Sequence, residues 1–513
     1  MNPPLLIVAL VTAQTWSPLE PRADLPRRFP RVNAVPSLLL PTPRVGLFWT
    51  AGNPAGLRAE LTDTRTDFAL ATSHESGALR RPLDPGASTL RQASGLGWTP
   101  VDSRLALLGR VVIDQERFDP GTHADVVEAY PTSPFVPLDT SSTATRRTRV
   151  RLEGGAGLQL GVWGLGLTLG YEAREHQTIA AGLVRRTRQT MPGATIGLTR
   201  RLGSVRLGPY ARWRNRAETI FLIERAAQAS VIQLEGLRDV RPFDILSFYY
   251  RRIEEDIPSV GWAVAGPLGG GTWSLYAERS WLRERLTRQE ANDPAEDAWD
   301  VNAWDGGGAY QRMFGRTILT VDARYTRLRG DGDLALDSTG VILQAAERAA
   351  CAAVELRLGP DTIGWSLAVG VQVRWEYRLR DALTVPIAAH VMGLTEGASV
   401  EVGRAFSPRL FATATVGFAA YSANSSFPSP TALGPVYRSY ILPEYDLASR
   451  PAQPWLGAVA VQWKVGPRTS LWVRATGERV SPTRSGPTSF GPDGSRSVVG
   501  ASVGVTLRGP AQP

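Results

Sequence analysis

The sequence contains few of the side chains that build most metal and redox sites. Cysteine occurs once in 513 residues, so neither an intrachain disulfide nor a cysteine-based zinc site is possible, and Cys351 is expected to be a small strand residue. The four histidines are His74, His123, His176 and His390. His123 with Asp125 and Glu128 is the one candidate for a cation site in a loop, but the spacing is not diagnostic. We therefore expect no cofactor and no metal.

Lysine is almost absent as well. Lys464 is the single lysine among 57 basic residues, so arginine carries nearly all of the net charge of +9. A nucleic-acid-binding surface needs basic residues clustered with aromatic residues on one face. Here the arginines alternate with apolar residues along the chain, and we expect no nucleic-acid partner.

Long apolar runs are missing too. Beyond the N-terminus, no stretch of about eighteen apolar residues occurs, which excludes a transmembrane helix. At the N-terminus, Leu5–Val11 forms a short apolar core, and Val11-Thr12-Ala13 fits a small-residue cleavage site. We predict a signal peptide over residues 1–13. Because the residues before Leu5 include no lysine or arginine, a short buried N-terminal strand is the alternative.

The sequence is rich in segments that alternate with a period of two, which is typical of β-strands. In Ile363–Arg378 every odd position is apolar or aromatic, and every even position is small, polar or charged. A strand of a soluble protein sustains such alternation over about five or six residues. Sustaining it over sixteen residues, with Trp365 and Trp375 near the ends of the apolar row, indicates a tilted strand that spans a membrane. The pattern recurs at 165–172, 205–214, 319–326, 455–465 and 499–507.

The lengths of the connections give a second, independent pattern. Short Gly-, Pro-, Asp- and Ser-containing turns alternate with longer polar connections. The longer connections are expected at 75–87, 116–146, 176–190, 217–256, 285–299, 329–346, 379–392, 423–453 and 481–495. Transmembrane barrels have short periplasmic turns and longer external loops. The sequence therefore predicts an all-β fold, a single large antiparallel transmembrane β-barrel of about eighteen strands with both ends on the short-turn side. A soluble propeller is the alternative, but no blade repeat is found.

These patterns also predict how the chain is divided. The barrel is expected over residues 61–508, followed by a tail over 509–513. Residues 14–60 include a Pro- and Arg-rich stretch without regular period, and we expect them to lie inside or beneath the barrel as a partial plug. Outer-membrane barrels usually end on an aromatic residue, and the last predicted strand departs from this by ending at Leu507-Arg508.

The polar face of the predicted strands contains many arginines. The residues expected to face the lumen are Arg174, Arg206, Arg212, Arg214, Arg324, Arg374, Glu376, Arg378 and Arg474. Carboxylates are expected in the long loops, in the groups Asp114–Glu128, Glu254–Asp256 and Glu290–Asp297. One interpretation is a polar passage with an acidic mouth that biases solute entry. The other is that the arginines pair with carboxylates across a hydrated interior.

The first third of the chain resembles an uncharacterised family of outer-membrane β-barrels described mainly in Bacteroidetes-type bacteria. The residues that carry this resemblance are Trp49, Asn53-Pro54-Ala55-Gly56-Leu57, Ser76-Gly77, Arg81-Pro82, Asp84-Pro85-Gly86, Gly95, Gly97, Tyr130-Pro131 and Asp139. The resemblance implies an outer-membrane location without implying an activity. Asn53–Leu57 is also similar to the Asn-Pro-Ala stretch near the start of long-chain fatty-acid transporters; a Gly/Pro turn before the first strand is the alternative explanation.

Together these features predict a protein of the outer membrane of a Gram-negative-type bacterium. Its expected partners are outer-membrane lipid, the barrel-assembly machinery and another uptake protein. The first function considered is solute passage or binding, as a channel or an accessory of uptake, and the second is a non-conducting scaffold for surface attachment. A membrane-embedded hydrolase comes third, because no Gly-x-Ser-x-Gly nucleophile elbow is expected. We therefore expect no enzyme activity and no catalytic residues.

Overall fold

The structure is a computed structural model of the chain. It describes residues 45–80, 84–124, 135–178, 183–224, 231–235, 239–243, 248–290, 293–333, 341–359, 363–382, 387–427, 438–439, 442–483 and 494–509. The predicted signal peptide lies outside the described residues, as do Asp125 and Glu128 of the loop cation site considered above. None of the helices in the described ranges is long and apolar enough to cross a membrane.

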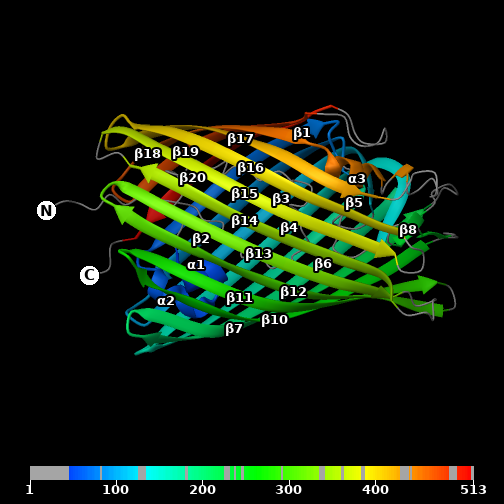
Figure 1. Cartoon of the computed structure of the whole chain (residues 1–513), viewed down its shortest axis with the longest axis horizontal. Helices are drawn as coiled ribbons and strands as arrows, with labels where there is room; N and C mark the ends of the chain where they lie inside the picture. The colour runs from blue at the N-terminus through cyan, green and yellow to red at the C-terminus, as the bar shows by residue number, and fades with distance from the viewer. Residues whose placement is uncertain are drawn as a thin grey trace.

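The described residues form one closed antiparallel β-barrel (Figure 1). The first part of its wall consists of β1 (Arg65–Gly77), β2 (Ala87–Pro100), β3 (Leu105–Ala124), β4 (Phe135–Leu160), β5 (Trp163–Thr178), β6 (Leu183–Leu202) and β7 (Val205–Glu224). The wall continues with β10 (Phe248–Leu268), β11 (Gly271–Glu290), β12 (Asp293–Phe314), β13 (Thr317–Asp333), β14 (Val341–Leu358) and β15 (Gly364–Ala382). It ends with β16 (Ile387–Ala405), β17 (Leu410–Ser426), β18 (Ala452–Lys464), β19 (Thr469–Pro482) and β20 (Arg496–Arg508).

The cylinder is closed by pairing between its first and last strands. In that pair Arg65 lies opposite Arg508 and Gly77 lies opposite Arg496, so neither strand has a free edge. Strand β7 pairs directly with β10. Strands β8 (Val231–Glu235) and β9 (Asp239–Phe243) form an additional hairpin, in which β8 pairs with the start of β4. The wall therefore has eighteen strands, and the predicted fold class is confirmed.

The two ends of the barrel differ in the length of their connections, as the sequence predicts. At one end neighbouring strands are joined by tight turns, such as Gly161–Val162 between β4 and β5 and Gly203–Ser204 between β6 and β7. In the β2–β3 turn the Asp102 carboxylate accepts hydrogen bonds from the backbone N–H groups of Arg104 and Leu105, which lowers the pKa of that exposed carboxyl. Helix α1, the first described element, and the end of β20, the last, both lie at this end of the barrel (Figure 1).

The strands are longer than the sequence predicts, because several predicted loops are strand. Asp114, Glu116 and Asp119 lie on β3, Glu254–Asp256 lie on β10, and Glu290 and Asp293–Asp297 lie on β11 and β12. The placement of these carboxylates in loops is wrong. Where a strand carries polar residues on both faces, the period-two hydrophobic signal disappears while the backbone hydrogen bonds of the ladder continue. The hydrophobic pattern therefore predicts where the outer face of the strands is apolar, a zone that we call the apolar belt. It does not predict where the strands end.

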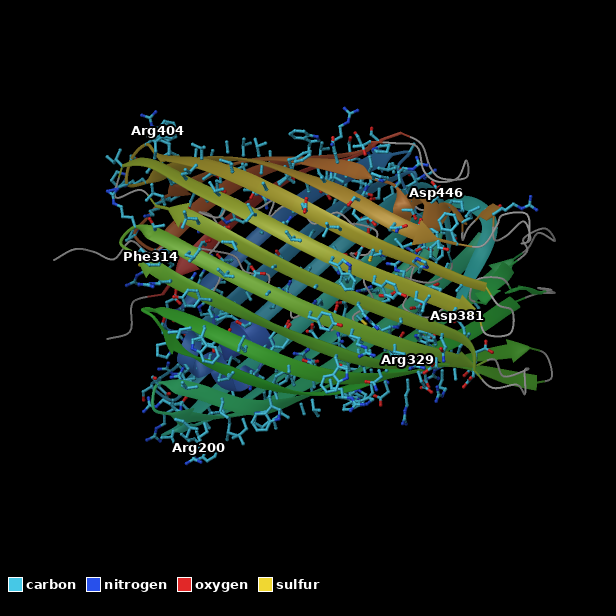
Figure 2. All side chains as sticks on the ribbon, in the orientation of Figure 1. Arg200, Phe314, Arg329, Asp381, Arg404 and Asp446 are labelled. Carbon is cyan, nitrogen blue, oxygen red and sulfur yellow. The ribbon has the colours of Figure 1, made fainter. Side chains whose placement is uncertain are left out.

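Side chains alternate between the two faces of the wall. On β15, Trp365 and Val371 are 63% and 52% exposed on the outside, whereas Ser366 and Ala368 are 2% and 6% exposed and point inward. Figure 2 shows side chains standing off the outer surface along its length. Aromatic side chains border the apolar outer belt, each covered by an arginine 4.1–5.1 Å from the ring centroid in the pairs Arg312–Phe314, Arg404–Trp365 and Arg200–Trp163.

The single cysteine offers a test of this alternation. Cys351 is exposed and lies in register between the inward residues Arg324 and Arg374, whereas Ala352 belongs to the outward row of β14. A charged, membrane-impermeant methanethiosulfonate should therefore label Cys351 in the protein reconstituted into phospholipid vesicles. A cysteine at position 352, in a C351S background, should react only with a lipid-soluble maleimide. Equal labelling of both positions by the charged reagent would contradict the assigned faces.

Candidate functional site

Short helical elements occupy the inside of the barrel near its short-turn end (Figure 1). They are α1 (Leu47–Ala51), the 3-10 helix η1 (Pro54–Gly56) and α2 (Leu57–Glu60). Helix α1 contacts β10, β11 and β12, η1 contacts β4, β5 and β6, and α2 contacts β3 and β4. We call residues 45–61 the N-terminal segment; among the described residues its main contacts are all on one side of the barrel.

Local interactions explain how this segment folds. Helix α1 ends at Gly52, whose φ of 71° lies in the left-handed region that favours glycine. The Asn53 side chain then caps η1 by accepting a hydrogen bond of 3.0 Å from the backbone N–H of Ala55. The Glu60 carboxylate folds back and accepts hydrogen bonds from the backbone N–H groups of Phe48 and Trp49, at 3.2 and 3.3 Å. Glu60 therefore joins α2 to the beginning of α1.

Apolar contacts hold the segment against the wall on two sides. On the β2–β3 side, Phe48, Leu57 and Leu61 form a buried cluster with Trp98 and Leu108. On the opposite flank, Leu47 and Ala51 pack against residues of β7 and β10, namely Tyr210, Ala263 and Ala265. Burying side chains of this kind contributes about 1.5–3 kcal/mol each relative to their exposure to water. The N-terminal segment is thus part of the packed core and not a loose tail.

A glycine-lined part of the inner wall receives η1 and the start of α2. A Cβ atom at Gly197 would lie 1.9 Å from Asn53 Oδ1, one at Gly166 would lie 2.1 Å from the Pro54 carbonyl carbon, and one at Gly157 would lie 2.7 Å from Leu57 Cβ. Real Cβ atoms do not approach other atoms this closely. Only glycine at these positions of β4, β5 and β6 lets the chain dock directly on the strand backbones. Asn53–Leu57 does form a turn, but the turn leads into α2 and docks on the wall.

The residues predicted to face the lumen all lie on inward positions of their strands, and most of them are paired with carboxylates. Arg174 pairs with Glu172, and Arg212 pairs with Glu278 at 3.3 Å. Arg324 donates two hydrogen bonds to Asp305, at 2.8 and 2.7 Å. Arg374 pairs with Glu376 at 3.4 Å, and Arg378 pairs with Glu347 at 3.7 Å. Their part in solute passage stays a prediction.

Two of the remaining arginines lie beside the N-terminal segment. Arg206 acts on Glu60 through the attraction of opposite charges. Arg214 lines a cavity of about 100 Å³ between the N-terminal segment and β4–β7, together with Arg151, Glu153 and Arg212. Arg212 also donates a hydrogen bond of 3.5 Å to the carbonyl of Ala51, so the wall binds the segment through polar as well as apolar contacts.

Arg474 on β19 differs from the other members of this set. It forms no ion pair with a carboxylate among the described residues, its buried Nε has no hydrogen-bond partner there, and Glu401 of β16 acts on it only through the attraction of opposite charges. Its neighbours in register are Ala460 on β18 and Ser502 on β20, both small. A cation in this position points its field into the lumen rather than into a partner carboxylate.

The carboxylates of the upper lumen are neutralised locally. Glu255 pairs with Arg216, which also lies 3.8 Å from Glu284, and Gln189 donates a hydrogen bond of 2.7 Å to Glu218. These side chains are at most 4% exposed. They form a buried network on the strands, so the expectation that Glu255 contributes to an acidic mouth in a long loop is wrong. The alternative interpretation, in which arginines pair with carboxylates across the interior, describes this region better.

A third helix lies at the long-loop end. Helix α3 (Leu442–Ser449) packs Tyr445 and Ala448 against Ala389 and Val391, which are inward residues of β16. Its Glu444 lies 3.5 Å from Arg378 of the wall. Helix α3 and the N-terminal segment therefore narrow the lumen at opposite ends (Figure 1).

Some residues of the site are missed by the sequence analysis. The pairing of Glu60 with α1 and the docking of Asn53 on Gly197 join distant segments and leave no local signal. Same-face pairs such as Glu172 with Arg174 do have a signal, because residues two apart on a strand share a face. The sequence also contains Gly-x-Ser-x-Gly spacing at Gly500–Gly504, but these residues lie within β20 and not at the strand-to-helix turn of a nucleophile elbow. No group of three or more possible metal ligands occurs among the described residues.

Comparisons with known proteins give a family and a set of distant structural neighbours. The model of a family of unknown function (DUF6850) matches residues 54–507. No curated protein matches the chain. The siderophore receptor PiuA from Acinetobacter baumannii is similar, at 9% identity over 86% of this chain and 82% of the receptor, with a TM-score of 0.39. BauA, the ferric preacinetobactin receptor of the same bacterium, shows 10% identity over 86% and 79%, with a TM-score of 0.40.

The alcaligin receptor FauA from Bordetella pertussis shows 9% identity over 88% of this chain and 76% of the receptor, with a TM-score of 0.36. Likeness at this level carries no information on cargo or partner. Neither a Bacteroidetes-type origin nor a similarity to fatty-acid transporters is shown by these matches, and both stay predictions.

Enlarging a docking glycine should release the N-terminal segment. Val at position 197 (Gly197→Val) would collide with Asn53, and overpacking of this kind costs about 1–3 kcal/mol. We expect faster amide hydrogen exchange at residues 47–57 while the barrel strands stay protected. The control is Gly154→Val on the outer face of β4, because a Cβ there meets nothing within 4 Å. Unchanged exchange in Gly197→Val would show that the docking is not tight.

The docking of the segment should weaken as the pH rises. Loss of hydration inside the barrel raises the pKa of Glu60 from 4.5 to about 7, although its N–H donors and Arg206 act in the opposite direction. A raised pKa means that docking is strongest below about pH 4.5 and weakens as the pH approaches 7, because the docked state resists deprotonation. Opening of residues 47–49, measured by hydrogen exchange corrected for intrinsic rates, should increase by up to about 100-fold between about pH 5 and 8. In Glu60→Gln the opening of residues 47–49 should no longer depend on pH. If the pH dependence persisted in this variant, another titrating group would be its cause.

Proposed function

We propose that this chain, which belongs to the family of unknown function DUF6850, is an outer-membrane β-barrel for the passage of a small polar solute. The outer surface supports the membrane location. Large apolar side chains such as Leu169, Trp262 and Val459 are each more than half exposed on it. A soluble protein does not expose a continuous apolar belt of this extent, whereas a barrel in lipid requires one.

A passage is supported by the side of the lumen that the N-terminal segment does not contact. The inward side chains of β18, β19, β20 and β1 on that side include the small residues Ala460, Thr476, Ser502 and Ala71. Cys351 on β14 is also exposed at an inward position of the wall. Eighteen-stranded barrels are wide enough for a water-filled lumen unless something fills them. The N-terminal segment fills one side and leaves a path along the other.

Arg474 is the observation that points to the charge of the solute. It is a lumen-facing cation whose Nε has no partner among the described residues, and it lies among small side chains on that path. A fixed unit charge in a narrow aqueous passage attracts ions of opposite sign. The proposed solute is therefore a small anion or carboxylate.

A non-conducting scaffold is the second candidate. It is favoured by the two obstructions, because α3 and the N-terminal segment occupy the lumen at opposite ends. A barrel closed at both ends would keep its outer surface available for attachment while passing nothing.

Planar-bilayer recordings of the full chain separate the two functions. Under the proposed function we expect steady current with a preference for chloride over potassium, and a larger current for Gly197→Val. Removal of the charge in Arg474→Gln should lower the anion preference about fivefold, the size expected for a unit charge acting across several ångströms of water-filled lumen.

The matched control is Arg479→Gln, which removes an arginine from the outer face of the same strand and should change nothing. Absence of current from both the wild-type chain and Gly197→Val would sink the proposed passage and favour the scaffold.

A further inference from the structure

The outer face of the barrel has a hollow over β1–β5. Its floor consists of outward glycines on three neighbouring strands, Gly95 and Gly97 on β2, Gly109 on β3 and Gly154 on β4. Larger side chains, including Phe68 and Tyr171, form its borders. The hollow has a volume of about 620 Å³, and a Cβ at Gly109 or Gly154 would meet nothing within 4 Å. Four missing side chains thus create a depression in the apolar belt.

A second hollow of about 660 Å³ adjoins the first toward the long-loop end. Leu70, Ala93, Ile113 and Val503 supply its outward apolar side chains. Leu70 follows Phe68 along β1 and Ala93 precedes Gly95 along β2, so the two hollows share their strands. From Arg91 to Gly97 the depression runs about 20 Å along β2 at about 3.3 Å per residue.

A block of polar side chains lies at the upper end of this depression. Strand register places the outward residues in two rows of four, Thr72–Arg91–Gln115–Thr148 and His74–Thr89–Arg117–Arg146. Neither row contains a carboxylate on β1–β4, and the first row continues on β5 with Glu175, which pairs with Arg186 and lies 3.9 Å from Arg188. The nearest acid on β3 is Asp119, which forms an exposed ion pair of 3.0 Å with Arg117. The block therefore presents positive charge and hydrogen-bond donors directly above an apolar floor.

We propose that this surface binds one lipid of the outer leaflet, with a phosphate headgroup on the polar block and acyl chains in the hollows. Charge complementarity supports an anionic headgroup, because the arginines of the block outnumber its carboxylates and phosphate is bound well by Arg donors. The orientation of the surface also fits a lipid of the outer leaflet. The polar block lies toward the long-loop end of the barrel, where the headgroup of such a lipid lies, and the hollows extend toward the short-turn end, where its acyl chains lie. The inference rests on the proposed membrane location but not on solute passage.

A second copy of the chain is the competing occupant. A stable protein interface buries about 800 Å² on each partner and needs a complementary convex surface. A glycine-floored hollow joined to a donor-rich block matches a flexible amphiphile better than the flat wall of another barrel. An inter-barrel contact remains an outcome that the experiment detects.

The test uses the full chain in phosphatidylcholine nanodiscs that contain a small fraction of bisphosphorylated lipid A. Native mass spectrometry after mild release measures how many lipid A molecules stay bound, and dephosphorylated lipid A is the comparison probe. We expect one retained lipid A and weak retention of the dephosphorylated form. Arg91→Gln should weaken retention about fivefold, the effect of one basic side chain at an anionic membrane surface.

Gly109→Leu tests the hollow separately from the headgroup block. It should fill the floor without a clash and reduce retention of both probes. Its control is Gly457→Leu, an outward position of β18 where a Cβ also meets nothing within 4 Å, and the control for Arg91 is Arg479→Gln.

Three results would overturn the proposal: no preference for the phosphorylated probe, equal losses in the controls, or a dimer in place of bound lipid. Conductance measured on the same variants keeps this question apart from the proposed function. Lipid retention lost with the current intact supports the lipid site, and a silent barrel that still retains lipid A refutes only the passage.

Discussion

The closed hydrogen-bond ladder is the constraint on which the rest of this structure depends. A strand in lipid has no water to satisfy its backbone groups, so the sheet must close, and it does so where Arg65 of β1 meets Arg508 of β20. Closure assigns every side chain to one of two environments that alternate along each strand. The outward positions take Leu, Val and Trp, and the inward positions take Gly, Ser, Thr and charged residues, because one face meets lipid and the other meets water.

Polar and charged side chains are tolerated on the inner face only because water in the lumen hydrates them or side chains of opposite charge pair with them. The bidentate contact between Arg324 and Asp305 spans two neighbouring strands, and Tyr276 adds a hydrogen bond of 3.0 Å to the same carboxylate. Isolated burial of either charge would be costly, whereas a paired and hydrogen-bonded arrangement within a hydrated interior is tolerated. This pairing covers much of the wall, and Arg474 stands out because it forms no ion pair with a carboxylate among the described residues.

The sequence predicts the strands well within the apolar belt. It predicts poorly how far the strands extend toward the long-loop end and which segments pack inside the barrel. Alternation over Ile363–Arg378 is enough to place β15 and its faces, because lipid and water impose opposite demands on neighbouring residues. Above the belt both faces are polar, so the upper parts of β3, β10 and β11 lose their hydrophobic signal while the ladder continues. Inside the barrel, contacts such as Asn53 with Gly208 join residues 155 positions apart, and a single sequence contains no record of such pairs. The glycines of the inner wall are visible in the sequence, but their purpose becomes clear only with the segment that docks on them.

The inner docking wall and the floor of the outer hollow are both built from glycines, and they meet on β4. On β4, Gly154 faces outward while Gly155 and Gly157 face the N-terminal segment, so over this stretch the wall carries almost no side-chain bulk on either side. On β5, Gly164 and Gly166 continue the inner row, and on β2 and β3 the outer row continues with Gly97 and Gly109. A bare wall packs poorly by itself, because glycine loses the most conformational entropy on folding and supplies no apolar surface. Contacts with η1 and α2 offset that deficit from the inside. A lipid held in the outer hollow would offset it from the membrane, so the two occupants would stabilise one thin stretch of barrel from opposite faces.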